Sequence, residues 1–260
     1  MRRIIALHGW LDNCASFDQI AARLNADVLC LDLAGHGQSG YRQHLGAYNV
    51  WLDLPEILAV ADQMEWPTFE LLGHSRGAAI AFVLSATFAK RVERLVCLDG
   101  IFPLVAPASK APDQLYHSIN SVKKQLAKSR SYYPTFEQAV QARQNGMFPL
   151  SERDAHALAR RAVIETQNGY TWQYDPKATA PSELRFTPEQ LMAFARALAT
   201  PVDLIIAEGG IIHGNQEIQR VLKHFVEWRV ITLPGGHHFH MSEQAESIAN
   251  IINSVSGGMA

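Results

Sequence analysis

The sequence has 260 residues, is 48% hydrophobic and carries a formal net charge of −2. This composition is typical of one large globular domain with a real core. No run of Lys and Arg stands out, so nucleic acid and anionic membranes are not expected partners. The longest apolar stretch, residues 78–89, is too short to span a bilayer, and we expect no membrane association.

The cysteines and the amino-terminal stretch indicate a compartment. The basic and apolar start, MRRIIALHGW, has a short apolar part and no small-residue cleavage site, so it does not predict a signal peptide. Cys14, Cys30 and Cys97 lack metal-ligand spacing. An odd number of cysteines without a signal peptide indicates free thiols in the reducing cytoplasm, and we expect a cytoplasmic protein.

Short apolar runs alternate with helical patterns along most of the chain. Strands are predicted at residues 4–8, 28–33, 69–73, 95–99, 202–207 and 229–233, and helices near 17–24, 54–64, 77–91, 216–227 and 243–252. Most strand runs are continuously apolar, which is typical of parallel strands covered on both faces. The sequence therefore predicts an α/β fold with a mostly parallel sheet. Pro55 is expected near the start of its helix, with Asp53 as the N-cap.

The alternation breaks between about residues 101 and 200. Ser151 and the Thr187-Pro188 pair indicate helix starts, and no strand is expected there. An insertion at the carboxyl edge of a sheet favours a lid over the site, because ligands of such sheets bind at that edge. We predict a core of residues 1–100 and 200–260 and a helical cap of residues 101–199; a plain helical extension is the alternative. Some cap aromatics are expected to line a pocket, although each could simply pack the cap: Tyr116, Tyr132, Tyr133, Phe136, Phe148, Tyr170, Trp172 and Tyr174.

The segment GHSRG, residues 73–77, places Ser75 between a predicted strand and a predicted helix. A tight strand–turn–helix connection strains the central residue, and side chains at positions 73 and 77 would clash with the strand or the helix. Gly73 and Gly77 remove that clash and leave the hydroxyl exposed at the sheet edge. The pattern predicts a nucleophile, and an ordinary glycine-rich turn is the alternative.

A serine nucleophile needs a base and donors for an oxyanion. His237 follows the last predicted strand in PGGHHFHMSE and is the first candidate base, with His238 and His240 as rivals. Three neighbouring histidines also raise a metal site, but no acidic residue or cysteine has matching spacing, and no metal is expected. The main-chain N–H groups of Trp10 and Arg76 are the expected oxyanion donors.

Four segments together resemble the α/β-hydrolase fold family: LHGW, LDLAGHGQS, GHSRG and PGGHHFHMSE, in that order. The run HGWLDNCASFD is similar to the serine hydrolase-like protein subgroup. The resemblance implies Ser75 as the nucleophile and His237 as the base. It also implies Trp10 and Arg76 as oxyanion donors and a structural role for His36.

The sequence departs from that family in two ways. It begins almost at the first strand, so about six strands are expected rather than eight. The strand after the cap has Gly210 near the position where the family usually has an aspartate. Asp99, at the end of the preceding strand, and Glu208 are the alternative acids. Asp99 could instead cap a turn or pair with Arg76, whose charge opposes the helix dipole and needs an anion from the protein or the substrate.

These observations predict a serine hydrolase that cleaves a small carboxylic ester through a Ser75–His237–acid triad and an acyl-enzyme. Thioesters and amides rank behind esters. A non-catalytic ligand-binding protein on the same fold, or a hydrolase of carbon–carbon bonds, are the alternatives. No cofactor is expected: the sequence has neither a G-x-G-x-x-G after the first strand nor a P-loop. A small molecule is the expected partner, and the oligomeric state is open.

Overall fold

The computed structural model describes residues 1–225 and 227–254. A six-stranded sheet forms its centre, in the order β2-β1-β3-β4-β7-β8, and every neighbouring pair is parallel. The strands are β1 (Arg3–Leu7), β2 (Asp27–Leu31), β3 (Phe69–His74), β4 (Val92–Leu98), β7 (Val202–Gly209) and β8 (Arg229–Gly236). The predicted parallel sheet of about six strands is confirmed.

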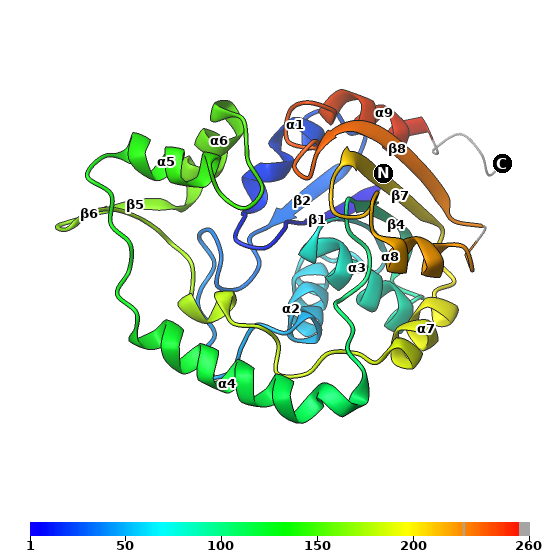
Figure 1. Cartoon of the computed structure of the whole chain (residues 1–260). Helices are drawn as coiled ribbons and strands as arrows, with labels where there is room; N and C mark the ends of the chain where they lie inside the picture. Colours follow the sequence, from blue (N-terminus) through cyan, green and yellow to red (C-terminus); the bar gives the residue numbers. More distant parts are fainter. Residues whose placement is uncertain (226, 255–260) are drawn as a thin grey trace.

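Helices cover both faces of this sheet (Figure 1). The short 3-10 helix η1 (Cys14–Phe17), α1 (Asp18–Ala21) and α9 (Ala245–Ser254) pack on one face. The other face carries α2 (Val50–Gln63), α3 (Arg76–Thr87), α7 (Pro188–Ala197) and α8 (Gln216–Leu222). Helix α3 is buried from Gly77 to Ser85, so the residue that precedes it is held by a rigid element.

The structure corrects two predicted helices. Helix α2 begins at Val50 after Asn49, so Pro55 lies inside the helix and Asp53 is a fully buried helical residue, not the N-cap. The prediction was wrong because the carboxylate of Asp53 forms ion pairs with two arginines, and does not accept hydrogen bonds from the first N–H groups of the helix. The helix predicted to reach residue 227 ends at Leu222, and Val226 lies outside the described residues.

The chain between β4 and β7 contains η2 (Ala108–Lys110), α4 (Ala111–Ala127), α5 (Phe136–Gln144), α6 (Glu152–Ala162), β5 (Val163–Thr166), β6 (Gly169–Trp172) and η3 (Pro176–Thr179), followed by α7. The predicted caps are confirmed: Ser151 caps α6, and Thr187 forms a capping box with Gln190. The hairpin β5–β6 contradicts the expectation of helix alone. β-Branched residues from Val163 onward and Gly169, with φ of 107°, favour a hairpin there.

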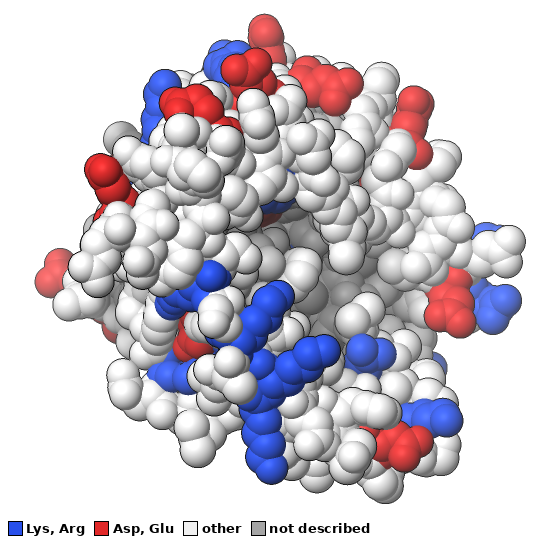
Figure 2. Space-filling view, turned by 60° about the vertical axis from the view of Figure 1, so that its left-hand side comes forward, with Lys and Arg blue, Asp and Glu red and all other residues white. Residues whose placement is uncertain are grey.

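Charged side chains are unevenly distributed over the surface, although the net charge is small. Figure 2 shows a hollowed face on which Lys and Arg side chains gather beside the hollow, while acidic side chains lie mostly towards its edge. All three cysteines are free thiols, as expected. Within residues 1–225 and 227–254, no helix is both long and apolar enough to cross a membrane.

Candidate active site

Ser75 lies in the turn between β3 and α3, as the sequence predicts, with φ of 52° and ψ of −114°. This strained conformation is held by main-chain hydrogen bonds: Ser75 N donates to Leu98 O (3.1 Å), and Ala78 N donates to Ser75 O (3.1 Å). Gly77 is required because a β-carbon there would overlap the carbonyl of Leu7 in β1. The turn is thus held against two neighbouring strands, and Ser75 is left partly exposed.

His237 follows β8 and meets Ser75 across the sheet edge. Its Nε2 lies 3.0 Å from Ser75 Oγ, and its Nδ1 lies 2.6 Å from Asp99 Oδ2. Because a carboxylate only accepts hydrogen bonds, Nδ1 carries the hydrogen and Nε2 has a free lone pair. His237 is 6% exposed and Asp99 is fully buried, so the contact between them is shielded from water. The arrangement can draw a proton from the hydroxyl of Ser75.

Of the two candidate acids, the structure brings Asp99 to His237. Asp99 follows β4 with φ of 40°, and its Oδ2 also accepts from Ile211 N (2.9 Å). Glu208, the last residue but one of β7, is exposed. The alternative pairing of Asp99 with Arg76 is wrong, since Arg76 Nη2 donates to Asp53 Oδ2 (2.7 Å). A protein carboxylate therefore compensates the arginine at the start of α3.

The two rival histidines lie elsewhere. His238 Nε2 lies 3.1 Å from Asp12 Oδ2. His240 is fully buried against Phe17 and His74, and neither of its ring nitrogens has a hydrogen-bond partner among the described residues. Burial and the neighbouring histidines hold the pKa of His240 well below its usual value. His240 is thus a neutral packing residue.

Trp10 follows β1 in a turn, and its indole Nε1 donates to Ala178 O (2.8 Å). Its main chain is oriented by His8, whose Nδ1 lies 2.8 Å from Gly9 O and whose Nε2 accepts from Leu33 N (2.9 Å). Arg76 is the first residue of α3, so its N–H has no acceptor within the helix. Both residues border the space above Ser75.

His36 has the structural position that the resemblance implies. Its ring is buried beside His8 and Tyr48, and Nδ1 lies 3.0 Å from Ala34 O. Burial lowers the pKa of His36 to about 3. It is therefore neutral and belongs to the turn, not to the site.

Two cavities open at Ser75. The larger, of about 630 Å³, is mostly apolar and has an aromatic wall from outside the predicted set: Trp10, Tyr48, Trp51, Phe102 and Phe186. The smaller, of about 170 Å³, is lined by Phe148, whose ring centroid lies 4.4 Å from that of His237. Of the cap aromatics expected to line a pocket, Phe148 alone borders either cavity at Ser75 among the described residues. Tyr133, Trp172 and Tyr174 line a separate recess.

One wall of the larger cavity is the stretch of residues 178–186, which begins within η3. This stretch and the residues just before it are fastened to the loop before α2 in three places. Tyr48 Oη donates to Asp175 Oδ2 (2.7 Å), Lys177 Nζ donates to the carbonyls of residues 42 and 44, and Glu183 accepts from Asn49 Nδ2 (2.6 Å). These buried and partly buried contacts hold the wall in a fixed position.

Sequence reasoning missed a buried polar group beside His237. Asp12 Oδ1 accepts from Arg143 Nη2 of α5 (2.7 Å), and His74 Nε2 lies 2.9 Å from His237 O. Burial alone would raise the pKa of Asp12, but His238 and Arg143 outweigh it and hold that pKa well below the usual value. The signal in the sequence for this group was weak: Asp12 lies in the run HGWLDNCASFD, and His74 directly precedes Ser75.

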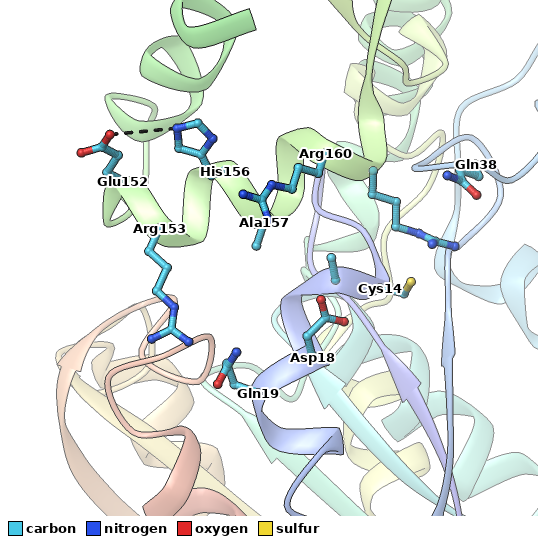
Figure 3. A pocket seen from close by; sticks show the side chains of 11 residues that line it. Cys14, Asp18, Gln19, Gln38, Glu152, Arg153, His156, Ala157 and Arg160 are labelled. Carbon is cyan, nitrogen blue, oxygen red and sulfur yellow. Dashed lines mark ion pairs between the residues drawn. The ribbon is translucent and has the colours of Figure 1, made fainter.

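A further hollow of about 960 Å³ lies away from these cavities. Figure 3 shows side chains of α6, including Arg153 and Arg160, facing Asp18 and Gln19 of α1 across it. None of the residues predicted for the site lines it, so it offers no nucleophile of the kind described above.

Comparison with known proteins agrees with this geometry. Residues 2–244 match the family described as alpha/beta hydrolase fold. A serine hydrolase-like protein of Dictyostelium discoideum is 28% identical over 96% of this chain and 74% of its own length. The crystal structure of a hypothetical protein from Pseudomonas aeruginosa PAO1 shares 36% identity, with a TM-score of 0.93 over 98% of this chain and 91% of that one. An esterase of Mycobacterium tuberculosis is 24% identical over 97% of this chain and 82% of its own length.

Proposed function

This chain belongs to the α/β-hydrolase fold family, in its serine hydrolase-like group, and from that premise we propose that it is a serine hydrolase acting on a small carboxylic ester. One observation carries the proposal: a continuous contact chain from Ser75 Oγ through His237 to the buried carboxylate of Asp99, at 3.0 Å and 2.6 Å. A strained serine, a correctly oriented imidazole and a shielded acid together activate a hydroxyl that is otherwise a poor nucleophile.

In the proposed mechanism, Ser75 Oγ attacks the ester carbonyl while His237 Nε2 takes its proton. The N–H groups of Trp10 and Arg76 donate to the oxyanion of the tetrahedral intermediate. His237 then returns the proton to the leaving alcohol, and an acyl-enzyme remains on Ser75. Water, deprotonated by His237, attacks this ester and releases the acid. Asp99 keeps the imidazole in its reactive tautomer and stabilises its charged form.

The larger cavity supports an apolar substrate part. Its volume of about 630 Å³ is in the range of small-molecule sites, and its walls are largely aromatic and aliphatic. The smaller cavity, on the side of Phe148 and His237, suits a compact group on the other side of the scissile bond. An ester is the preferred substrate because one relative over most of the chain is named an esterase. Thioesters and amides react through the same steps and rank behind it.

Residues 101–199 are proposed as the cap over this site, set on a core of residues 1–100 and 200–260. The cavity above Ser75 borders both parts, since Phe102 and Ser182 line it together with Ser75. Arg143 of α5, bonded to Asp12, adds a contact between the two on the other side of the nucleophile. The proposed enzyme needs no cofactor, and its cytoplasmic location stays a prediction.

A fluorophosphonate probe followed by intact mass spectrometry tests the proposal. The wild type is expected to gain one adduct, and Ser75→Ala none. Ser85→Ala is the matched control: Ser85 is buried in the same helix, and its hydroxyl has no partner among the described residues. It should label like the wild type. A folded wild type that stays unlabelled would overturn the proposal in favour of a ligand-binding protein. Labelling without turnover on a panel of esters, thioesters and amides would favour carbon–carbon bond hydrolysis.

A further inference from the structure

Asp12, His74 and His238 bring three metal-ligating side chains together beside the proposed active site. One donor atom from each lies within 4.8 Å of the other two, and all three side chains are buried. They come from the turn after β1, the end of β3 and the turn after β8. The Ser75–His237–Asp99 chain uses none of the three, so their grouping needs a separate explanation.

The ring of His74 has a fixed orientation with one unused nitrogen. Its Nε2 lies 2.9 Å from the carbonyl oxygen of His237, which can only accept, so Nε2 carries the hydrogen. Its Nδ1 is buried, lacks a hydrogen-bond partner in the described part of the chain, and lies 3.8 Å from Asp12 Oδ2. A lone pair and a carboxylate oxygen therefore face each other, an arrangement that a cation between them would stabilise.

The space beside these atoms is open because residue 9 is glycine. A β-carbon on Gly9 would lie 2.8 Å from His74 Nδ1 and 3.0 Å from Asp12 Oδ2. All three side chains line the smaller cavity of about 170 Å³, which also reaches Ser75. An ion entering that cavity therefore has a path to the three donors.

The donor set selects the class of ion. Two imidazole nitrogens and one carboxylate suit Zn²⁺, Cu²⁺, Ni²⁺ and Co²⁺, whereas Mg²⁺ and Ca²⁺ prefer oxygen alone. With zinc–ligand distances of about 2.0–2.2 Å, ligand atoms lie about 3.4 Å apart at a tetrahedral angle. Asp12 Oδ2 is 3.1 Å from His238 Nε2 and 3.8 Å from His74 Nδ1, which brackets that value.

A competing cation already contacts two of the three side chains. Arg143 Nη2 lies 2.7 Å from Asp12 Oδ1 and 3.2 Å from His238 Nε2. A guanidinium and a divalent ion at this spacing repel each other strongly in a buried site. Arg143 belongs to α5, so its displacement would loosen a contact between the proposed cap and the core.

We propose that Asp12, His74 and His238 form a transition-metal site that competes with Arg143 for the same side chains. Ion binding draws His74 towards Asp12 and moves His238 slightly away from it. His237, whose carbonyl accepts from His74 and which directly precedes His238, shifts with them. The ion thereby inhibits hydrolysis at Ser75; this consequence, unlike binding itself, rests on the proposed function.

Zn²⁺ affinity, measured by competition with a chromophoric chelator, tests binding apart from hydrolysis. The full-length Ser75→Ala chain serves as the parent, because it lacks the proposed nucleophile but keeps all three ligands. We expect one ion per chain, and a tetrahedral absorption spectrum with Co²⁺. His238→Gln in this parent should weaken Zn²⁺ binding by at least about tenfold. His117→Gln, an exposed histidine on α4, is the matched control and should change nothing.

Arg143→Gln provides a second test that stays informative if a ligand variant folds poorly. Removing the competing charge should tighten Zn²⁺ binding by at least about tenfold, and misfolding does not produce such a gain. The proposal is overturned if the parent binds no Zn²⁺, if His238→Gln and His117→Gln bind alike, or if Arg143→Gln does not bind more tightly. Failure of ester turnover in the wild type would leave these three results unchanged.

Discussion

The carboxylate of Asp99 occupies the space where a side chain on Gly210 would begin. A β-carbon at position 210 would overlap both carboxylate oxygens of Asp99. The two residues follow neighbouring parallel strands, β4 and β7, and so reach the same point of the sheet edge. Position 210 is where the resemblance leads one to expect the acid. In this chain one strand end carries the carboxylate, and the other leaves room for it.

Asp99→Asn tests which acid serves His237. The amide keeps the shape but favours the wrong imidazole tautomer, so kcat should fall by about 10⁴-fold. Glu208→Gln is the matched control, because this exposed carboxylate lies at the end of β7, and its kcat should stay within about twofold of the wild type. Steady-state kinetics on one ester decide the point. A large loss in Glu208→Gln with a small one in Asp99→Asn would reverse the assignment.

Gly210→Ala should inactivate the enzyme without touching any charged residue. The added methyl group displaces the Asp99 carboxylate from His237, and a misplacement of about 1 Å costs about 10²-fold. The double variant Asp99→Gly/Gly210→Asp moves the acid across to the other strand end. It should recover part of the activity lost in Asp99→Gly alone. If Gly210→Ala is fully active, the steric argument is wrong.

Asp53→Asn should destabilise the fold. Its buried carboxylate accepts from Arg42 Nη2 (2.8 Å) and Arg76 Nη2 (2.7 Å), and its loss leaves two poorly hydrated cations together. The free energy of unfolding should fall by about 3–5 kcal/mol in urea titrations. Glu56→Gln is the control: this half-exposed partner of Arg42 should cost less than about 1 kcal/mol. Equal losses in the two variants would contradict the argument.

Stability should fall in acid because His36 is buried in its neutral form. Its folded-state pKa of about 3 lies below the unfolded value of about 6.5, so the unfolded chain binds a proton first as the pH drops. The contribution of neutral His36 to the free energy of unfolding is complete above pH 6.5 and is lost as the pH falls towards 3. Between pH 7.5 and 5.5 the loss amounts to about 1.4 kcal/mol.

His36→Asn isolates that effect, since asparagine does not titrate. Urea titrations at pH 7.5 and 5.5 should show a difference between the two pH values that is smaller by about 1.4 kcal/mol in the variant than in the wild type. A lower stability of the variant at both values does not matter to this comparison. An unchanged difference would mean that the pKa of His36 is not lowered in the folded protein.

The sequence was most informative where function depends on a local turn. Ser75 needs small neighbours within two residues, and His237 stands in a glycine-rich loop directly after a strand, so both could be assigned from short segments. The sheet could be predicted equally well, because strands buried on both faces are continuously apolar.

The acid and the polar surroundings depend on contacts between distant segments. Asp99 directly follows β4 and Glu208 is the last residue but one of β7, and the choice between them depends on the register of β4 against β7, which no local pattern contains. The contact of Asp12 with Arg143 joins the first strand's turn to α5, 131 residues away in sequence. The aromatic pocket wall was misplaced for the same reason: it comes mainly from Trp51, Phe102 and Phe186.

The wall of residues 178–186 can change the substrate preference without changing the residues that carry out the proposed reaction. Glu183 in the wall, and Asp175 and Lys177 just before it, contact the loop before α2, whereas Ser182 and Leu184 line the cavity. A single bridge of Phe186 to Val105 is the strand pairing of this stretch among the described residues, so Ser182 and Leu184 can be exchanged without disturbing the elements that hold Ser75. A combinatorial library confined to those positions would therefore explore new substrate preferences while Ser75, His237 and Asp99 stay unchanged.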